Sequence, residues 1–128
     1  MPKPSHEDAA TLLQLAQLYA TTGAGEAFGW VRSKAFIADY KQFSEKYPPD
    51  SEEALKVGRL LQFFETAGTL HKHGLVHEDL LFDWIAADLV WGYVKDFVQS
   101  VRAAAGYNAL YENFEAMAKA NVAWTSRR

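Results

Sequence analysis

Hydrophobic positions recur along this chain at the spacing of α-helices. Apolar residues follow one another at three- and four-residue intervals, and no segment alternates apolar and polar residues for the length of a β-strand. Asn-Gly and Asp-Gly pairs, which are typical of tight β-hairpins, do not occur. The pattern predicts an all-α protein, a single-domain antiparallel bundle of about five helices: 5–21, 26–47, 50–73, 78–105 and 108–124.

Residues that start or stop helices mark the ends of these segments. Ser5–Asp8 has the form of a capping box, and Asp50–Glu53 offers a second one. The Pro48-Pro49 pair stops the second helix, and no proline follows it. Gly74 is a natural C-terminal cap for the third helix.

Two of the predicted helices have unusual faces. Helix 78–105 is apolar nearly all round between Trp84 and Val94, because Asp88 is the only charged residue there. Such a helix lies at the centre of a domain or in a subunit interface. Helix 26–47 carries one aromatic stripe, formed by Phe36, Tyr40, Phe43 and Tyr47.

Length and composition agree with one globular domain. The chain has 128 residues, of which 49% are hydrophobic and 14% aromatic, which excludes a disordered protein. This length is enough to bury one hydrophobic core. We expect one helical domain over residues 1–128, with 1–4 and 125–128 frayed. Cysteine is absent, so disulfides and thiolate metal sites are excluded.

The net charge and the distribution of apolar residues exclude some classes of binding partner and location. The formal net charge is −3, which argues against nucleic acid, because such binding needs clustered excess Lys and Arg. His6, Glu7 and Asp8 interrupt the stretch that an export signal would need, and no apolar run is long enough for a membrane span. We therefore expect a cytoplasmic protein without a cofactor.

A histidine group could in principle bind a metal ion. His71, His73 and His77 lie within seven residues, but the turn at Gly74 separates them, and neither HExxH nor ExxH occurs. We interpret them as solvated residues around a joint between helices and predict no metal site.

Glu65 is the more informative polar residue. It shares a helix face with Gly58 and Gly68, where a second helix can approach closely, so its carboxylate should be partly buried and need a partner. Arg102 is one possible donor, although it lies roughly 28 Å further along the next helix at 1.5 Å per residue. A direct pair would need a bend or break near Gly92. The indole of Trp84 is nearly level with Glu65 and is the partner favoured by geometry.

Part of the chain resembles a family of small bacterial helical proteins known only as a domain of unknown function. The resemblance covers the stretch from Leu60 to Trp124, and the family has no established activity. It implies that Glu65, Arg102 and Glu115 belong to one polar network. The residues that carry it are Leu61-Gln-Phe-Phe-Glu65, His73-Gly-Leu-Val76, Trp91, Arg102 and Tyr111-Glu-Asn-Phe-Glu115.

Two functions fit these observations. The first is a non-catalytic interaction or scaffold protein, a homodimer that self-associates through helix 78–105, since apolar area beyond one small core marks an association surface. The second is a small-molecule sensor or enzyme, with a pocket around Glu65, Trp84, Trp91 and Arg102. We favour the first, because no nucleophile constellation is recognisable.

Overall fold

The computed structural model describes residues 2–128, and helices are the only regular secondary structure in that range. The all-α prediction is therefore confirmed. The described residues form seven helices instead of about five: α1 (His6–Thr22), α2 (Ala24–Val31), α3 (Tyr40–Lys46), α4 (Glu52–Lys72), α5 (Glu78–Trp84), α6 (Ala87–Ala105) and α7 (Glu112–Ser126).

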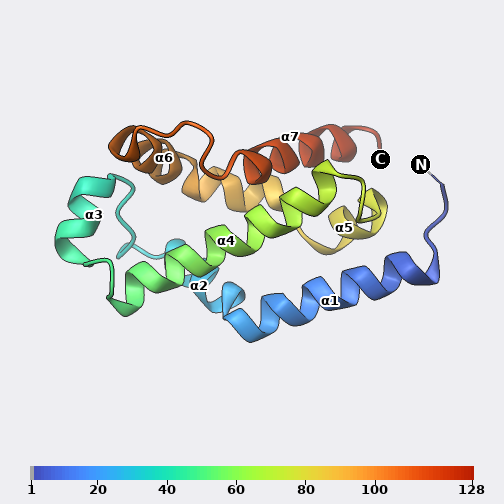
Figure 1. Ribbon diagram of the computed structural model, residues 1–128, viewed down its shortest axis with the longest axis horizontal. Coiled ribbons are helices and arrows are strands. Elements are labelled where there is room, and N and C mark those ends of the chain that lie inside the picture. The colour runs from blue at the N-terminus through green and yellow to red at the C-terminus, as the bar shows by residue number, and fades with distance from the viewer. Residues whose placement is uncertain (1) are drawn as a thin grey trace.

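The longest helix, α4, runs through the middle of the molecule (Figure 1). In this view α1 lies along one side of α4 and α7 along the other, while α3 and α5 lie at opposite ends. Helix α4 packs against α7 and α2, and α6 packs against α7. Fully buried side chains of α4, α5, α6 and α7 form the centre of the core: Leu60, Leu61, Leu81, Val94, Val98, Phe114 and Met117.

Local sequence signals set the start of α1 and the end of α4 as expected. The Ser5 hydroxyl accepts a hydrogen bond from the Asp8 N–H at 3.1 Å, and the Asp8 carboxylate accepts one from the Ser5 N–H at 2.8 Å. This is the predicted capping box. At the C-terminal end of α4, Gly74 has a left-handed backbone with φ 70°, and the Leu75 N–H donates to the Leu70 carbonyl at 2.9 Å.

The start of α4 differs from its prediction. The capping box predicted at Asp50–Glu53 is wrong, because the N-cap of α4 is Ser51, whose hydroxyl accepts a hydrogen bond from the Ala54 N–H at 3.2 Å.

The single helix expected over 26–47 is wrong, because residues 32–39 separate α2 from α3. Short polar side chains bond to the backbone there and compete with helical bonding. The Ser33 hydroxyl donates to the Trp30 carbonyl at 2.6 Å, and the Asp39 carboxylate accepts from the Gln42 N–H at 3.0 Å, which starts α3.

The break rearranges the aromatic stripe into a cluster. Phe36 precedes α3, and its ring lies 5.4 Å from that of Phe97 on α6, centroid to centroid. Phe43 of α3 lies 4.9 Å from the same ring. The aromatic residues therefore pack around Phe97 and join α3 to α6.

The continuous helix expected over 78–105 is also wrong. Ile85 and Ala86 have extended or irregular backbone and separate α5 from α6, whereas Gly92 lies inside α6 without a break. The N–H of Ala87, the first residue of α6, donates to the buried side-chain oxygen of Asn121 on α7 at 2.8 Å. A residue of another helix thus replaces the local N-cap that Ala86 cannot provide.

The last helix begins and ends later than its sequence predicts. Asn108 is not its N-cap; α7 begins at Glu112, after the left-handed residue Tyr111, and includes Thr125 and Ser126. At the other end of the chain, the Pro2 carbonyl accepts a hydrogen bond from His77. The expectation of fraying also covers Met1, which lies outside the described residues.

Within residues 2–128, none of the helices combines the length and the apolar character that crossing a bilayer requires.

Candidate functional site

Glu65 of α4 binds the first turn of α7. Its two carboxylate oxygens accept hydrogen bonds from the Asn113 side-chain amide at 2.8 Å and from the Phe114 backbone N–H at 2.9 Å. Phe114 is the third residue of α7, the position whose N–H an N-cap side chain ordinarily satisfies. The negative charge also lies at the positive end of the helix dipole. Glu65 therefore caps α7 from another helix.

Gly68 explains how α7 comes so close to Glu65. A Cβ atom added at Gly68 would lie 2.4 Å from the Asn113 carbonyl oxygen and 2.9 Å from the Phe114 nitrogen. Only glycine permits this approach of the α7 backbone to α4. Gly58, the other glycine of the same face, has no atom within 4 Å of such a Cβ. The close approach expected along this face therefore occurs at Gly68 alone.

Arg102 of α6 makes a second set of contacts to the same region. Its Nε donates to the Leu110 carbonyl at 2.8 Å, and its Nη1 lies 2.9 Å from the Glu115 carboxylate. The guanidinium also lies over the ring of Trp91, 5.8 Å from its centroid. Trp91 in turn packs edge-to-face on Phe114 at 5.1 Å. Arg102 thus ties α6 to the residues on both sides of the α7 N-terminus.

The contacts of Glu65 and those of Arg102 both involve residues at the start of α7, but the two side chains do not pair with each other. Glu65 pairs with neither Arg102 nor Trp84, the two partners considered from sequence. Trp84 lies elsewhere, packed edge-to-face on Tyr19 at 6.0 Å and on Phe63 at 6.2 Å. The structure therefore brings Trp91, Arg102 and Glu115 together, places Glu65 at the neighbouring residues Asn113 and Phe114, and leaves Trp84 in a separate aromatic group.

Tyr111 connects the two sets through the backbone. It is the only non-glycine residue of 2–128 with positive φ, at 59°. A bulky residue in this conformation costs about 1–3 kcal/mol and persists where surrounding contacts hold it. Glu65 holds the helix that follows, and Arg102 holds the Leu110 carbonyl that precedes it. Burial, and secondarily the negative charge of Glu65, raises the pKa of the Tyr111 phenol above 10.

The three histidines do not converge. The His71 Nε2 lies 2.9 Å from a Glu78 carboxylate oxygen, His77 bonds to the Pro2 carbonyl, and His73 ends α4 on the surface. His77 is only 5% exposed, so the interpretation of the group as solvated is wrong for this residue. Over residues 2–128, no cluster of three or more His, Cys, Asp or Glu side chains is arranged to hold a metal ion.

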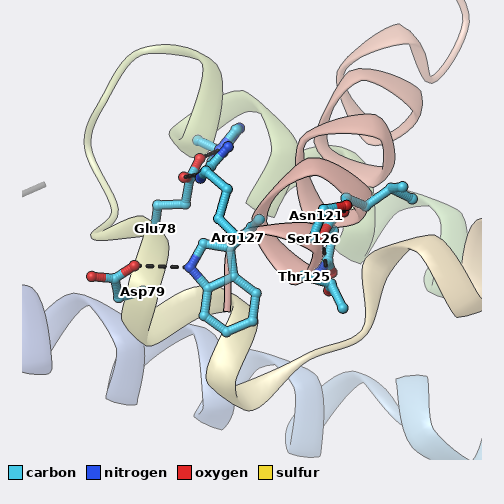
Figure 2. Close-up of polar contacts among 9 residues, drawn as sticks. Glu78, Asp79, Asn121, Thr125, Ser126 and Arg127 are labelled. Carbon is cyan, nitrogen blue, oxygen red and sulfur yellow. Dashed lines mark hydrogen bonds and ion pairs between the residues drawn. The ribbon is translucent and has the colours of Figure 1, made fainter.

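The C-terminal end of α7 carries polar contacts that sequence reasoning missed. The Trp124 indole N–H donates to the Asp79 carboxylate at 2.8 Å, and Arg127 binds Glu78 at 3.1 Å (Figure 2). Asn121, one turn before Trp124, is the residue that caps α6. The available signal was the acidic first turn of α5 at Glu78 and Asp79, which attracts donors from a neighbouring helix.

Most of the polar groups around the N-terminal end of α7 make contacts within the chain. Both oxygens of Glu65 accept hydrogen bonds, and two of the three Arg102 nitrogens have acceptors, while Nη2 is buried without one. Such an arrangement stabilises helix packing.

The tryptophans of the expected pocket line two different hollows. Trp84 borders one of about 190 Å³ with Phe28 and Leu89, and Trp91 borders another of about 240 Å³ with Lys95. Trp84 and Trp91 therefore border separate hollows, and neither of these two hollows is shared with Glu65 or Arg102.

Comparison with known proteins adds a family and no activity. A family model described as a domain of unknown function, DUF4760, matches residues 4–124. The match extends the resemblance seen from Leu60 onward to nearly the whole chain. No curated protein and no solved structure matches the chain significantly.

Proposed function

The chain belongs to the DUF4760 family of domains of unknown function, and from the geometry of its surface we propose a non-catalytic interaction protein that pairs with a second copy of itself. The observation that carries this proposal is an exposed strip on α6 that presents two large hydrophobic side chains, Leu89 and Tyr93, to solvent. We define the α6 outer strip as Leu89, Gly92, Tyr93 and Asp96, which recur at the spacing of one helix face.

The α6 outer strip faces away from the core. Leu89 is 53% exposed and Tyr93 is 47% exposed, whereas Val90 and Val94 on the opposite face are buried. The apolar residues expected around this helix therefore divide into two groups. Val90 and Val94 pack into the core, while Leu89 and Tyr93 remain exposed to solvent. Isolated exposed apolar residues are ordinary, but adjoining ones on one helix face indicate an association surface.

Neighbouring helices extend the strip into a wider patch. Phe28 of α2 packs edge-to-face on Tyr93 at 5.7 Å, and the hollow lined by Trp84 and Ile85 adjoins Leu89. A flat helix face thus borders a shallow aromatic depression that a side chain of a partner can enter.

Charge and shape favour a second copy as the occupant. Gly92 has no atom within 4 Å of the position of a Cβ, so the strip has a notch where the backbone of another helix can approach. The patch carries Asp96 and also Arg32, whose guanidinium lies 4.8 Å from the Phe28 centroid. A surface with both signs of charge complements itself when two copies are related by a two-fold axis.

Sedimentation equilibrium tests the proposal. We expect the wild-type protein to form a dimer at micromolar concentration and Leu89→Asp to shift the dissociation constant upward at least tenfold, because it places a charge in the apolar contact. Leu13→Asp is the matched control, since Leu13 is 69% exposed on α1 outside the patch. It should leave the dimer unchanged.

Two results would contradict the proposal. A wild-type protein that remains monomeric at high micromolar concentration has no dimer to explain. Equal weakening by Leu89→Asp and Leu13→Asp would place association outside the α6 outer strip.

A further inference from the structure

A third hollow, separate from the α6 outer strip, is lined by residues of α3, α4 and α6. It has a volume of about 250 Å³, and no charged residue lines it. Its walls are dominated by aromatic rings: Tyr40, Phe43, Tyr47, Phe97 and Tyr111. We call this space the α3 crevice. Neutral aromatic walls disfavour an ionic ligand and provide edges and faces for a planar one.

Gly58 of α4 lines the α3 crevice and is exposed to solvent, so it lies at the open edge of the crevice. Glycine inside a helix costs roughly 0.5–1 kcal/mol relative to alanine. Gly68 on the same helix has a structural reason, the close approach of Asn113, but Gly58 has open space where its Cβ would lie. At Gly58 the missing side chain therefore leaves this edge of the crevice open and serves no packing contact within the chain.

The hydroxyl groups of the α3 crevice are only partly used. The Tyr47 hydroxyl donates to the Ala35 carbonyl at 2.9 Å, and the Ser44 hydroxyl donates to the Tyr40 carbonyl at 2.6 Å. Among the hydrogen bonds of residues 2–128, none uses the Tyr40 or Tyr111 hydroxyl. These two phenols remain available as donors to a ligand that carries an acceptor.

Tyr111 lines the crevice in a strained backbone conformation. Its left-handed backbone is fixed between Arg102 and Glu65, as described above. Its phenol is protonated at neutral pH, as tyrosine ordinarily is, and can donate a hydrogen bond. Burial and the neighbouring Glu65 raise the pKa of this phenol further. Strained residues of this kind concentrate at sites that bind ligands.

We propose that the α3 crevice binds a small, uncharged aromatic molecule that carries a hydrogen-bond acceptor, with Tyr111 as donor and Gly58 leaving the edge of the crevice open. The volume of about 250 Å³ lies just below the common range of ligand pockets, which begins near 300 Å³, so one or two rings fit. This site is independent of self-association through α6.

Three probes of similar size test the chemistry. Acetophenone has a ring and a carbonyl acceptor, benzoate adds a charge, and cyclohexyl methyl ketone lacks the aromatic ring. Binding is followed by amide chemical shifts in two-dimensional NMR spectra of the full chain. We expect acetophenone to shift the amides of Ser44, Gly58 and Phe97, with affinity at least fivefold above that of either other probe.

Substitutions then test the location. Gly58→Leu fills the crevice and should weaken acetophenone binding at least tenfold. Gly29→Leu is the matched control, because Gly29 is also a helical glycine with open space around its Cβ and lies outside the crevice. It should bind as the wild type does. Tyr111→Phe removes only the hydroxyl and should weaken binding several-fold.

The outcomes separate clearly once the melting temperature shows that each variant is folded. Acetophenone shifts that map to the crevice and disappear in Gly58→Leu support the proposal. Absence of acetophenone binding, equal binding of benzoate, or an unchanged affinity in Gly58→Leu would overturn it. None of these results depends on the oligomeric state, so the α6 proposal stands or falls separately.

Discussion

The Glu65 carboxylate accepts a hydrogen bond from the backbone N–H of Phe114 at 2.9 Å, across 49 residues of sequence. This contact caps α7 from α4, because the residue at the N-cap position, Tyr111, makes no side-chain cap. The start of α6 is capped in a similar way by Asn121. Two helices of this protein therefore begin where another helix supplies an acceptor.

Substitution of Glu65 should destabilise the protein in a graded way. Glu65→Gln keeps one acceptor oxygen and loses the charge at the α7 N-terminus, so we expect a loss of about 1 kcal/mol. Glu65→Leu leaves the Phe114 N–H and the Asn113 amide without acceptors, so we expect about 3 kcal/mol. Urea unfolding measures both. Glu112 lies in the first turn of α7 but is exposed, so Glu112→Gln should cost much less stability than Glu65→Gln. An equal cost would mean that Glu65 acts only through its charge and not as a cap.

The two glycines on one face of α4 should respond oppositely to alanine. Gly68→Ala forces the α7 backbone away from α4 and should cost about 2 kcal/mol, because the new Cβ would lie 2.4 Å from the Asn113 oxygen. Gly58→Ala should stabilise the protein by about 0.5–1 kcal/mol, since only helix propensity changes. Denaturant midpoints give the comparison. Tolerance of Gly68→Ala would mean that α7 does not approach α4 as closely as described.

Asn121 should control the first turn of α6. It is 3% exposed, and its oxygen is the acceptor for the Ala87 N–H. Asn121→Ala should cost about 2 kcal/mol and speed hydrogen exchange of the Ala87 amide. Asn121→Asp keeps an acceptor and should protect that amide better than alanine does. Unchanged exchange in Asn121→Ala would refute the capping role.

Arg102 should couple to Glu115 and not to Glu65. A double-mutant cycle with Arg102→Met and Glu115→Gln should give a coupling energy of about 1 kcal/mol, because the pair is direct and partly buried. The cycle with Arg102→Met and Glu65→Gln should be additive within roughly 0.5 kcal/mol. Strong coupling in the second cycle would show that the two sets of contacts act as one network.

Tyr111 should make stability depend on pH in the alkaline range. Its pKa is raised above 10 in the folded chain, whereas the unfolded chain ionises it near 10. The folded state therefore holds this proton longer, and the stabilisation present below pH 10 is lost as pH rises through the folded pKa. Tyrosinate absorbance should show a late transition that Tyr111→Phe removes.

Removal of Glu65 provides the control for this titration. Because burial is the larger cause of the raised pKa and the Glu65 charge the smaller, Glu65→Gln should lower the late transition without abolishing it. A late transition that persists unchanged in Tyr111→Phe would assign it to another tyrosine.

Periodicity and local caps determined much of this protein from its sequence. The all-α class follows from apolar spacing, and α1 and α4 follow from signals within a few residues of their ends, at Ser5 and Gly74. The importance of Glu65 also followed from sequence, because a carboxylate beside Gly68 on a helix face needs a partner. These inferences succeed because their causes are local in the chain.

Only the tertiary structure decided where the other helices break and what Glu65 binds. The break at Ile85 is stabilised by Asn121, and α7 starts after Tyr111 because Glu65 and Arg102 hold that turn. Each of these hydrogen bonds joins a backbone group to a side chain of a different segment of the chain. The spacing of apolar residues along the chain does not indicate which side chain that is. The identity of the acceptor is set by which helices pack together, and that is decided by burial of the core.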